Sequence, residues 1–414
     1  MDAPNPEAVE YDPFSPEVLS DPFPTYDELR ERCPVHHFSD FGDHGFYTLS
    51  RYEDVAALSR ETDDWSADYG QGPIYHREGG LRSDPPEHTI YRRLVTAAFT
   101  PRRVAALEGE IRQVATELVD KFAADGATDL CPSFSGPLPM TVISKILGVP
   151  LDKRDEFKEW SNEFMASGSS GDAAIQAQRQ ADARAKIYAY FDDELDRRRR
   201  VMTVTTTSEE PSASSVDLLD SLLLATHEGR GFTNEQLLPL LLLLLVGGNE
   251  TTTSLISNLV HRLLQFGLWE RVTSDETLWD IAVEESLRFD PPVLGLFRTA
   301  KGPQKVRGVD IESDAKVHGL YAAANRDPSA WDNPGAFSLD RDLAQLRRHH
   351  LSFGLGIWLC PGANLARLEG RIALEVLGQR LPGLIETAPP RRPNTFMQWS
   401  IIEQPVAWVN SVAT

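Results

Sequence analysis

The sequence contains little cysteine: Cys33, Cys131 and Cys360 are three cysteines in 414 residues. An odd number of widely spaced cysteines does not suggest a disulfide framework and fits a reducing compartment. The N-terminus also lacks a basic start followed by an apolar stretch, because residues 1–22 are acidic and rich in proline. No signal peptide is therefore predicted, and we expect a cytoplasmic protein.

Positive charge and long apolar runs are also scarce. The chain has 41 Lys and Arg residues against 62 Asp and Glu residues, a formal net charge of -21 that argues against a general nucleic-acid role. The most apolar run, Leu237–Val246, is too short to cross a bilayer, and polar residues follow it directly. In a soluble protein, a helix that is apolar on all sides belongs in the middle of the core. We therefore expect neither nucleic acid nor membrane as a partner.

The patterns along the chain are mostly α with a minor β region. We find no fixed-period repeat and no clear change of composition, so a single domain over residues 1–414 is predicted. Residues 1–20 are expected to form an irregular lead-in, and the Thr- and Ser-rich residues 201–216 a mobile surface loop. Helices are predicted over 21–31, 86–99, 101–123, 141–147, 152–166, 176–200, 233–265, 278–289 and 363–381, with strands over 46–49 and within 295–320.

The segment 353–362 reads Phe-Gly-Leu-Gly-Ile-Trp-Leu-Cys-Pro-Gly, and a predicted helix follows it. Glycines permit tight turns and close approach of the backbone to a flat ligand. A Cys at a helix N-terminus is close to positive dipole ends, which favours thiolate. A buried structural cysteine beside a turn is the alternative. The segment resembles the haem-binding signature of the cytochrome P450 family, Phe-Gly-x-Gly-x-His-x-Cys-x-Gly, with Trp358 where the family usually has His.

This resemblance implies a haem-thiolate site. Cys360 would be the axial ligand of the iron of haem b, a ligand type that promotes O–O cleavage. Phe353, Gly354 and Gly362 would surround the cofactor. Trp358 is predicted to cover the porphyrin edge with its ring, while its N–H reaches a propionate or a bound water.

A second segment, 247–252, reads Gly-Gly-Asn-Glu-Thr-Thr in the middle of the predicted buried helix. Glycines and a polar run are costly there. One structural explanation is that Thr bonds back to the preceding turn and bends the helix. The segment resembles the family's oxygen-activation motif, in which the helix is locally opened. The resemblance implies that Glu250 feeds protons and that Thr251 holds dioxygen and water.

Two further motifs complete the resemblance. Glu285 and Arg288 share one helix face, as in the family's Glu-x-x-Arg motif, whose third member matches Arg341. The resemblance gives this triad a structural role. His88 and Arg92 lie four residues apart, so one helix face presents both. As a lone pair they would be solvated, but the resemblance implies that they bind the haem propionates together with Arg298.

The resemblance covers nearly the whole chain and implies the P450 fold, a triangular, mostly helical prism around a buried haem. It also implies a monomeric monooxygenase that inserts one atom of O2 into a hydrophobic small molecule. Electrons would come from NAD(P)H through a ferredoxin reductase and a ferredoxin. A peroxygenase that uses hydrogen peroxide is one alternative, although the Glu-Thr pair is typically replaced in such relatives. A non-enzymatic haem sensor or carrier is the other, and it would not need a proton-delivery pair.

Alignment with the family also places a set of mostly apolar residues near the substrate pocket, each of which could instead be ordinary core. Arg77 and Arg82 could pair with a substrate carboxylate or be solvated. A local basic patch of Arg102, Arg103, Arg347 and Arg348 could steer an acidic ferredoxin. The predicted pocket residues are Ile74, Tyr75, Phe164, Met165, Leu243, Gly247, Val293, Leu294, Leu296, Phe396 and Met397.

Overall fold

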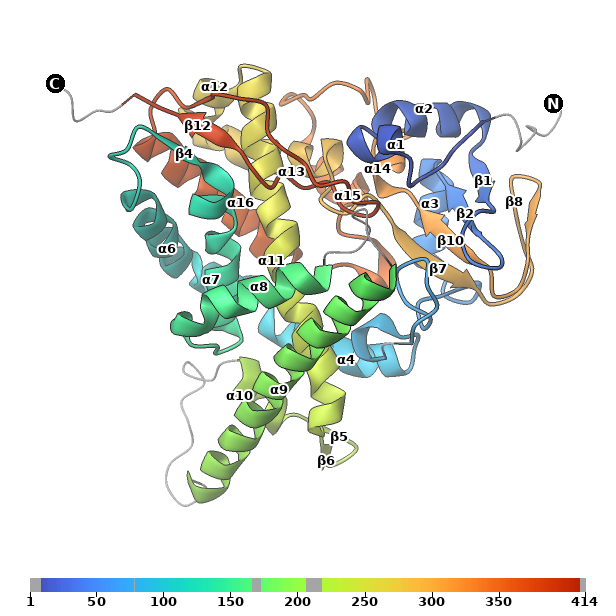
Figure 1. Ribbon diagram of the computed structural model, residues 1–414, viewed down its shortest axis with the longest axis horizontal. Coiled ribbons are helices and arrows are strands. Elements are labelled where there is room, and N and C mark those ends of the chain that lie inside the picture. The colour runs from blue at the N-terminus through green and yellow to red at the C-terminus, as the bar shows by residue number, and fades with distance from the viewer. Residues whose placement is uncertain (1–8, 78, 166–172, 206–217, 410–414) are drawn as a thin grey trace.

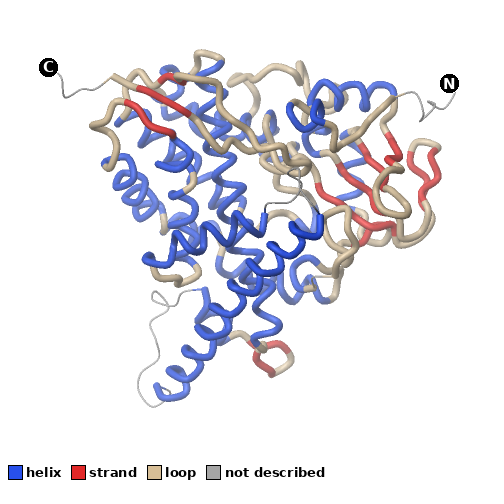
Figure 2. The backbone as a smooth tube through the Cα atoms, in the orientation of Figure 1, coloured by secondary structure: helices blue, strands red, loops and turns tan. Residues whose placement is uncertain are grey.

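The computed structural model describes residues 9–77, 79–165, 173–205 and 218–409. Helices make up most of it, and the largest sheet lies toward the end of the molecule where the N-terminus is drawn (Figures 1 and 2). The predicted class, mostly α with a minor β region, is confirmed. The helices are α1 (Pro16–Ser20), α2 (Phe23–Arg32), α3 (Tyr52–Arg60), α4 (Glu87–Ala98), α5 (Pro101–Ala106), α6 (Glu108–Asp120), α7 (Pro137–Ile146), α8 (Arg154–Met165), α9 (Ala173–Thr205), α10 (Leu218–Leu224), α11 (Asn234–Gln265), α12 (Trp269–Thr273), α13 (Trp279–Phe289), α14 (Tyr321–Ala324), α15 (Leu343–His349) and α16 (Ala363–Arg380).

The largest sheet joins segments that are far apart in the sequence, residues 35–66 and 296–319. It has five strands in the order β1-β2-β10-β7-β3, and β2 pairs with β10 in parallel while its other pairs are antiparallel. Its strands are β1 (Val35–Phe38), β2 (Phe46–Leu49), β3 (Trp65–Ser66), β7 (Leu296–Ala300) and β10 (Lys316–Gly319). Smaller sheets pair β11 (Ile385–Glu386), β12 (Pro405–Ala407) and β4 (Ala127–Asp129), then β5 (Thr226–His227) with β6 (Arg230–Gly231), and β8 (Gln304–Val306) with β9 (Val309–Ile311).

The long helix α11 runs through the helical part and packs on α7, α9, α13 and α16. It begins with a capping box in which Thr233 and Gln236 satisfy each other's backbone N–H groups. α11 is long and apolar enough to cross a membrane, but 72% of its most apolar window is buried inside the protein. A Cβ at Gly248 would lie 2.9 Å from Ile143, so glycine there lets α7 approach closely.

Three predicted segments differ from the structure. The lead-in contains α1, because Ser15 caps the N–H of Val18 and Pro16 suits the first helical position. The predicted helix 101–123 divides into α5 and α6 at Leu107, whose N–H bonds back three residues to Val104. Helix α9 continues through residues 201–205, since weak propensity does not stop a helix that is already propagating. The rest of the predicted loop, 206–216, lies outside the described residues.

Candidate active site

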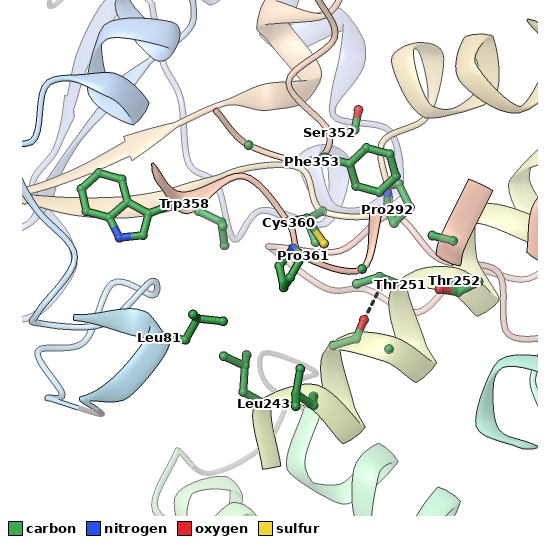
Figure 3. A pocket seen from close by; sticks show the side chains of 18 of the residues that line it. Leu81, Leu243, Thr251, Thr252, Pro292, Ser352, Phe353, Trp358, Cys360 and Pro361 are labelled. Carbon is green, nitrogen blue, oxygen red and sulfur yellow. Dashed lines mark hydrogen bonds between the residues drawn. The ribbon is translucent and has the colours of Figure 1, made fainter. Parts of the chain in front are cut away.

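A cavity of about 240 Å³, the main cavity, lies between α11, α4, β7 and the loop before α16. Cys360 lines it from that loop and Thr251 from α11 (Figure 3). His88 comes from α4 and Arg298 from β7. The fold therefore brings residues from all of the segments predicted to carry chemistry to one space.

The backbone of the cysteine loop is tightly folded. Gly354 and Gly356 have φ of +69° and +66°, a conformation that L side chains rarely adopt. A Cβ at Gly356 would lie 3.2 Å from the carbonyl oxygen of Ser59 on α3. The N–H of Cys360 donates to the carbonyl of Phe353 at 2.8 Å, which turns the loop back on itself. These turns hold the thiol in the wall of the cavity.

The surroundings of the thiol act on its pKa in opposite directions. Burial raises the pKa of Cys360, whereas the backbone N–H of Gly362 and the guanidinium of Arg92 favour the thiolate and lower it. The effect of burial is the larger one, so the pKa of Cys360 is raised, although the helix N-terminus favours the thiolate as expected. A metal ion at the sulfur would reverse the balance, because a coordinating thiol is deprotonated.

His88, Arg92 and Arg298 form a group of buried or half-buried nitrogen donors, of which the two arginines are cationic. Burial lowers the pKa of all three side chains. His88 Nε2 and Arg298 Nε are buried without a hydrogen-bond partner. Arg92 donates to the carbonyl of Leu359, at the cysteine loop. None of the described residues that line the main cavity is acidic, so this group suits an anionic ligand.

Trp358 packs against these donors. Its ring lines the cavity, lies 4.6 Å from the guanidinium carbon of Arg298 and makes an edge contact with the ring of His88. Its Nε1–H donates to the carbonyl of Ser83 at 3.3 Å. The expected direction of the N–H, toward a propionate or its water, is therefore corrected: the loop before α4 satisfies it.

Thr251 lines the main cavity, and its hydroxyl donates to the carbonyl of Gly247 at 2.6 Å, drawn as a dashed line in Figure 3. α11 is a continuous helix through this segment. The predicted local opening is therefore wrong for this structure, and the bond back to the preceding turn, the structural explanation, is what forms.

Glu250 faces the other way. Its Oε1 accepts from Lys158 Nζ of α8 at 2.6 Å and from Asn249 Nδ2 at 2.9 Å. Its side chain is 20% exposed and does not line the main cavity. The structure thus does not bring the two predicted catalytic residues together. Of the two, Thr251 lines the cavity and Glu250 does not.

Comparison with known proteins agrees with this geometry. The family model described as Cytochrome P450 matches residues 25–265 and 275–404. The chain belongs to the cytochrome P450 family. It is 36% identical to mycinamicin IV hydroxylase/epoxidase of Micromonospora griseorubida, covering 92% of this chain and 94% of that protein. It is 34% identical to cytochrome P450 monooxygenase PikC of Streptomyces venezuelae, covering 93% and 90%.

A solved structure shows the same fold. That of the bacillaene polyketide synthase cytochrome P450 PksS of Bacillus subtilis 168 has a TM-score of 0.85 and 28% identity, covering 96% of this chain and 100% of that one. The predicted P450 fold is confirmed. The chain is a P450 monooxygenase, as its relatives are, and such an enzyme uses haem, redox partner proteins and a hydrophobic substrate.

The residues of the main cavity fit a haem. A thiol lies in its wall beside glycines that allow close approach of a flat group. Two arginines and a histidine, two of the three with buried unpartnered nitrogens, match the two carboxylates that a haem carries. The apolar remainder of the wall suits the porphyrin and an apolar substrate.

The predicted structural triad comes together beside this site. Arg288 and Glu285 are fully buried and paired by two hydrogen bonds of 2.7 and 2.8 Å. Arg341 Nε lies 3.1 Å from the same carboxylate. Arg288 also donates to the carbonyls of Asn325, Pro334 and Ala336. The triad thus fastens α13 to the chain that leads to the cysteine loop.

The predicted substrate residues do not all lie in one place. Leu243, Gly247, Val293 and Leu296 line the main cavity. Phe164 lines a second cavity, and Met165 lies in α8 with a side chain outside the described residues.

Five predicted pocket residues lie elsewhere and are corrected. Ile74 and Tyr75 are 69% and 50% exposed, and the Tyr75 hydroxyl donates to the carbonyl of Asp314. Leu294 packs in the core beside α2, while Phe396 and Met397 pack around Phe46 and Phe297. Leu294, Phe396 and Met397 do not line the cavity because they pack in or against neighbouring core clusters. Ile74 and Tyr75 do not line it because they lie in a loop that faces solvent.

Sequence reasoning missed two kinds of residue. Leu81, Phe99, Pro292 and Tyr321 line the main cavity but are scattered in sequence and carry no motif. The other is Glu284, next to the Glu-x-x-Arg motif, whose carboxylate accepts from His350 at 2.8 Å and from Arg367 of α16. Burial alone would raise the pKa of Glu284, but the hydrogen bonds from His350 and Arg367 lower it to about 2. The sequence signal for Glu284 is its place directly before Glu285 in the predicted helix.

Proposed function

We propose that this P450 binds haem b through Cys360 and inserts one atom of O2 into an apolar small molecule. The observation that carries the proposal is the main cavity, where a thiol, two arginines, a histidine and a threonine hydroxyl meet in a mostly apolar wall. Bound haem supplies the oxidising chemistry. Electrons come from NAD(P)H through a ferredoxin reductase and a ferredoxin, and the enzyme works as a cytoplasmic, single-domain monomer.

Each residue has a proposed task. His88, Arg92 and Arg298 hold the propionates, and Trp358 keeps Arg298 in place by covering its guanidinium. Phe353, Gly354 and Gly362 shape the loop around the thiol. Thr251 orders proton donors at the cavity. Glu250 exchanges protons on the α8 side, where Lys158 holds it, and must turn from Lys158 to serve the cavity.

The substrate class follows from the lining. Leu243, Val293 and Leu296 present apolar surface to the main cavity. Solved P450 structures similar to this one are described in complex with testosterone and with erythromycin B, at 29% and 30% identity. An apolar ring system or acyl chain fits the same kind of wall.

The test of the haem assignment uses cysteine variants. The reduced CO complex of the wild type is expected to absorb at the red-shifted position typical of thiolate ligation, and Cys360→His to move the band to the position typical of histidine. Cys131→Ser, a buried cysteine elsewhere, is the matched control and should leave the band unchanged. An unchanged band in Cys360→His would refute the assignment.

A peroxygenase remains the second candidate for the oxygen source. Thr251 in the cavity wall favours O2, because a hydroxyl there can order the protons that O2 reduction needs. Product formation with hydrogen peroxide but not with NAD(P)H and redox partners would favour the peroxygenase.

The electron-carrier site is proposed at the basic patch, with one change from its sequence version. Arg102, Arg103 and Arg348 are exposed. Arg347 is paired with Asp280 at 2.8 Å and lies 3.3 Å from Glu284, so its charge is largely compensated. Charge reversal at Arg102 or Arg348 should slow the first electron transfer more than reversal at Arg347, without changing substrate affinity. Equal, salt-independent rates in all variants would contradict the site.

A further inference from the structure

A second cavity of about 180 Å³ adjoins the main one. It lies among α8, α9, the first half of α11 and the loop around residues 76–82. Leu81, Arg82 and Leu243 line both cavities. Figure 3 shows Leu81 and Leu243 together at the side of the main cavity away from Ser352 and Phe353. The two spaces therefore adjoin at side chains that line both of them.

The second cavity is lined by cationic side chains, although the chain as a whole is acidic. Its described titratable lining residues, Tyr188 aside, are His76, Arg77, Arg82 and Arg184, and none of its described lining residues is acidic. Acidic residues outnumber Lys and Arg by 62 to 41 in the whole sequence. The rest of the lining is mostly apolar and comes largely from α11. A cationic side chain without a carboxylate partner, at the edge of an apolar pocket, suits an apolar molecule with an anionic end.

Arg184 carries most of this argument. It lies on α9, and the helix positions next to it, 180, 181, 187 and 188, hold Gln, Ala, Ile and Tyr. None of these can form an ion pair with it. Its guanidinium lies 5.9 Å from the ring centroid of Phe164 on α8, and its Nε is buried without a hydrogen-bond partner.

Other cations of α9 form ion pairs. Lys186 pairs with Glu163 at 3.3 Å, and Arg197 and Arg198 both pair with Glu194 at 2.7 Å. Arg77, at the cavity rim, pairs with Asp68 at 3.4 Å. Within the described part of the chain, no ion pair is formed by Arg184. A buried donor without an acceptor is costly, so a ligand oxygen there would be favoured.

We propose that the second cavity is the anion-binding end of the substrate site, and that the substrate is an apolar molecule ending in a carboxylate. Arg184 binds the carboxylate, and the apolar part passes Leu81 and Leu243 into the main cavity, toward Cys360 and Thr251. This proposal rests on the proposed monooxygenase function and adds the substrate class to it.

The test compares three ligands that differ at one end: tetradecanoic acid, its methyl ester and tetradecanol. Binding to the holoenzyme is followed by the haem spin-state band. The acid is expected to bind about tenfold more tightly than either neutral ligand, the worth of one charge-assisted hydrogen-bonded contact. Arg184→Gln should reduce that preference to about twofold or less by weakening the acid alone, and Arg184→Lys should retain part of it.

Arg179→Gln is the matched control, because Arg179 is an exposed arginine on the same helix outside the cavity. It should keep the wild-type preference, which rising salt should reduce only weakly for a buried contact. Equal affinity for acid and alcohol, or no response to the acid, would overturn the proposal. An equal loss of the preference for the acid in Arg184→Gln and in Arg179→Gln would also overturn it. The CO spectrum of the same samples reports the haem-thiolate separately, so failure of the substrate class is distinguished from failure of the proposed function.

Discussion

The two sides of the main cavity differ in how their charged side chains are paired. On the cysteine side, Glu285 is enclosed by Arg288 and Arg341, and Glu284 by His350 and Arg367. On the side of α8 and α9, Arg184 forms no ion pair within the described residues, and the shared lining is apolar or cationic. Paired charges hold the structure together, whereas a cation without an ion-pair partner, here Arg184, marks a place where a ligand could bind.

The largest expected effect comes from breaking the saturated side. Glu285→Gln leaves Arg288 buried with its charge uncompensated, which should lower the free energy of unfolding by about 3–5 kcal/mol. Loss of haem on mild heating is the companion readout. Asp310→Asn, which removes an exposed pair with Lys305, is the control and should change the unfolding midpoint little. Similar midpoints for the two variants would show that the triad is dispensable.

The next effect concerns the hydroxyl in the cavity wall. Thr251→Ala should leave substrate binding intact but divert reducing equivalents to hydrogen peroxide, lowering product per NAD(P)H by about tenfold. Thr253→Ala is a close control, because its hydroxyl also bonds back, to Asn249 at 3.0 Å, but does not line the cavity. Full product yield in Thr251→Ala, or loss of substrate binding, would contradict the assigned task.

A smaller effect is the acid dependence of stability. The pKa of Glu284 is about 2 in the folded protein against an ordinary value of 4.5, so its stabilisation is complete above about 4.5 and is lost as the pH falls toward 2. The contribution is about 3 kcal/mol. Thermal unfolding of wild type and Glu284→Gln should differ by much less at pH 3 than at pH 7. Glu228→Gln, at an exposed side chain, should shift neither curve. A constant difference across pH would rule out this group.

The smallest effect is expected at Trp358. Trp358→Phe keeps a ring beside Arg298 and loses only the bond to Ser83, a change of about 0.5–1.5 kcal/mol. Trp358→Ala removes both and should also weaken haem retention. The two variants are compared by haem dissociation rate. If Phe and Ala behave alike, the ring does not support Arg298.

Motifs in the sequence predicted most of the fold and the part of the site that surrounds the thiol. The cysteine loop and the Glu285 triad depend on neighbours a few residues away or on patterns with narrow physical solutions. The pocket residues were harder: whether Phe396 or Leu294 faces a cavity or an adjacent core cluster depends on packing between distant segments. Glu250 shows the same difficulty, because its direction is decided by Lys158, which is 92 residues away.

The parallel pairing of β2 with β10 has a consequence for synthesis of the protein. It brings together chain segments whose side chains Tyr47 and Glu312 meet across 265 residues. At about 5–20 residues per second, the early hairpin waits roughly 13–50 s for its partner strand to emerge from the ribosome. Arg298 lies on β7 beside that partner, and Cys360 follows later still. A nascent chain that ends before Cys360 lacks the sulfur of the proposed site, so haem capture is expected only after that residue has been made.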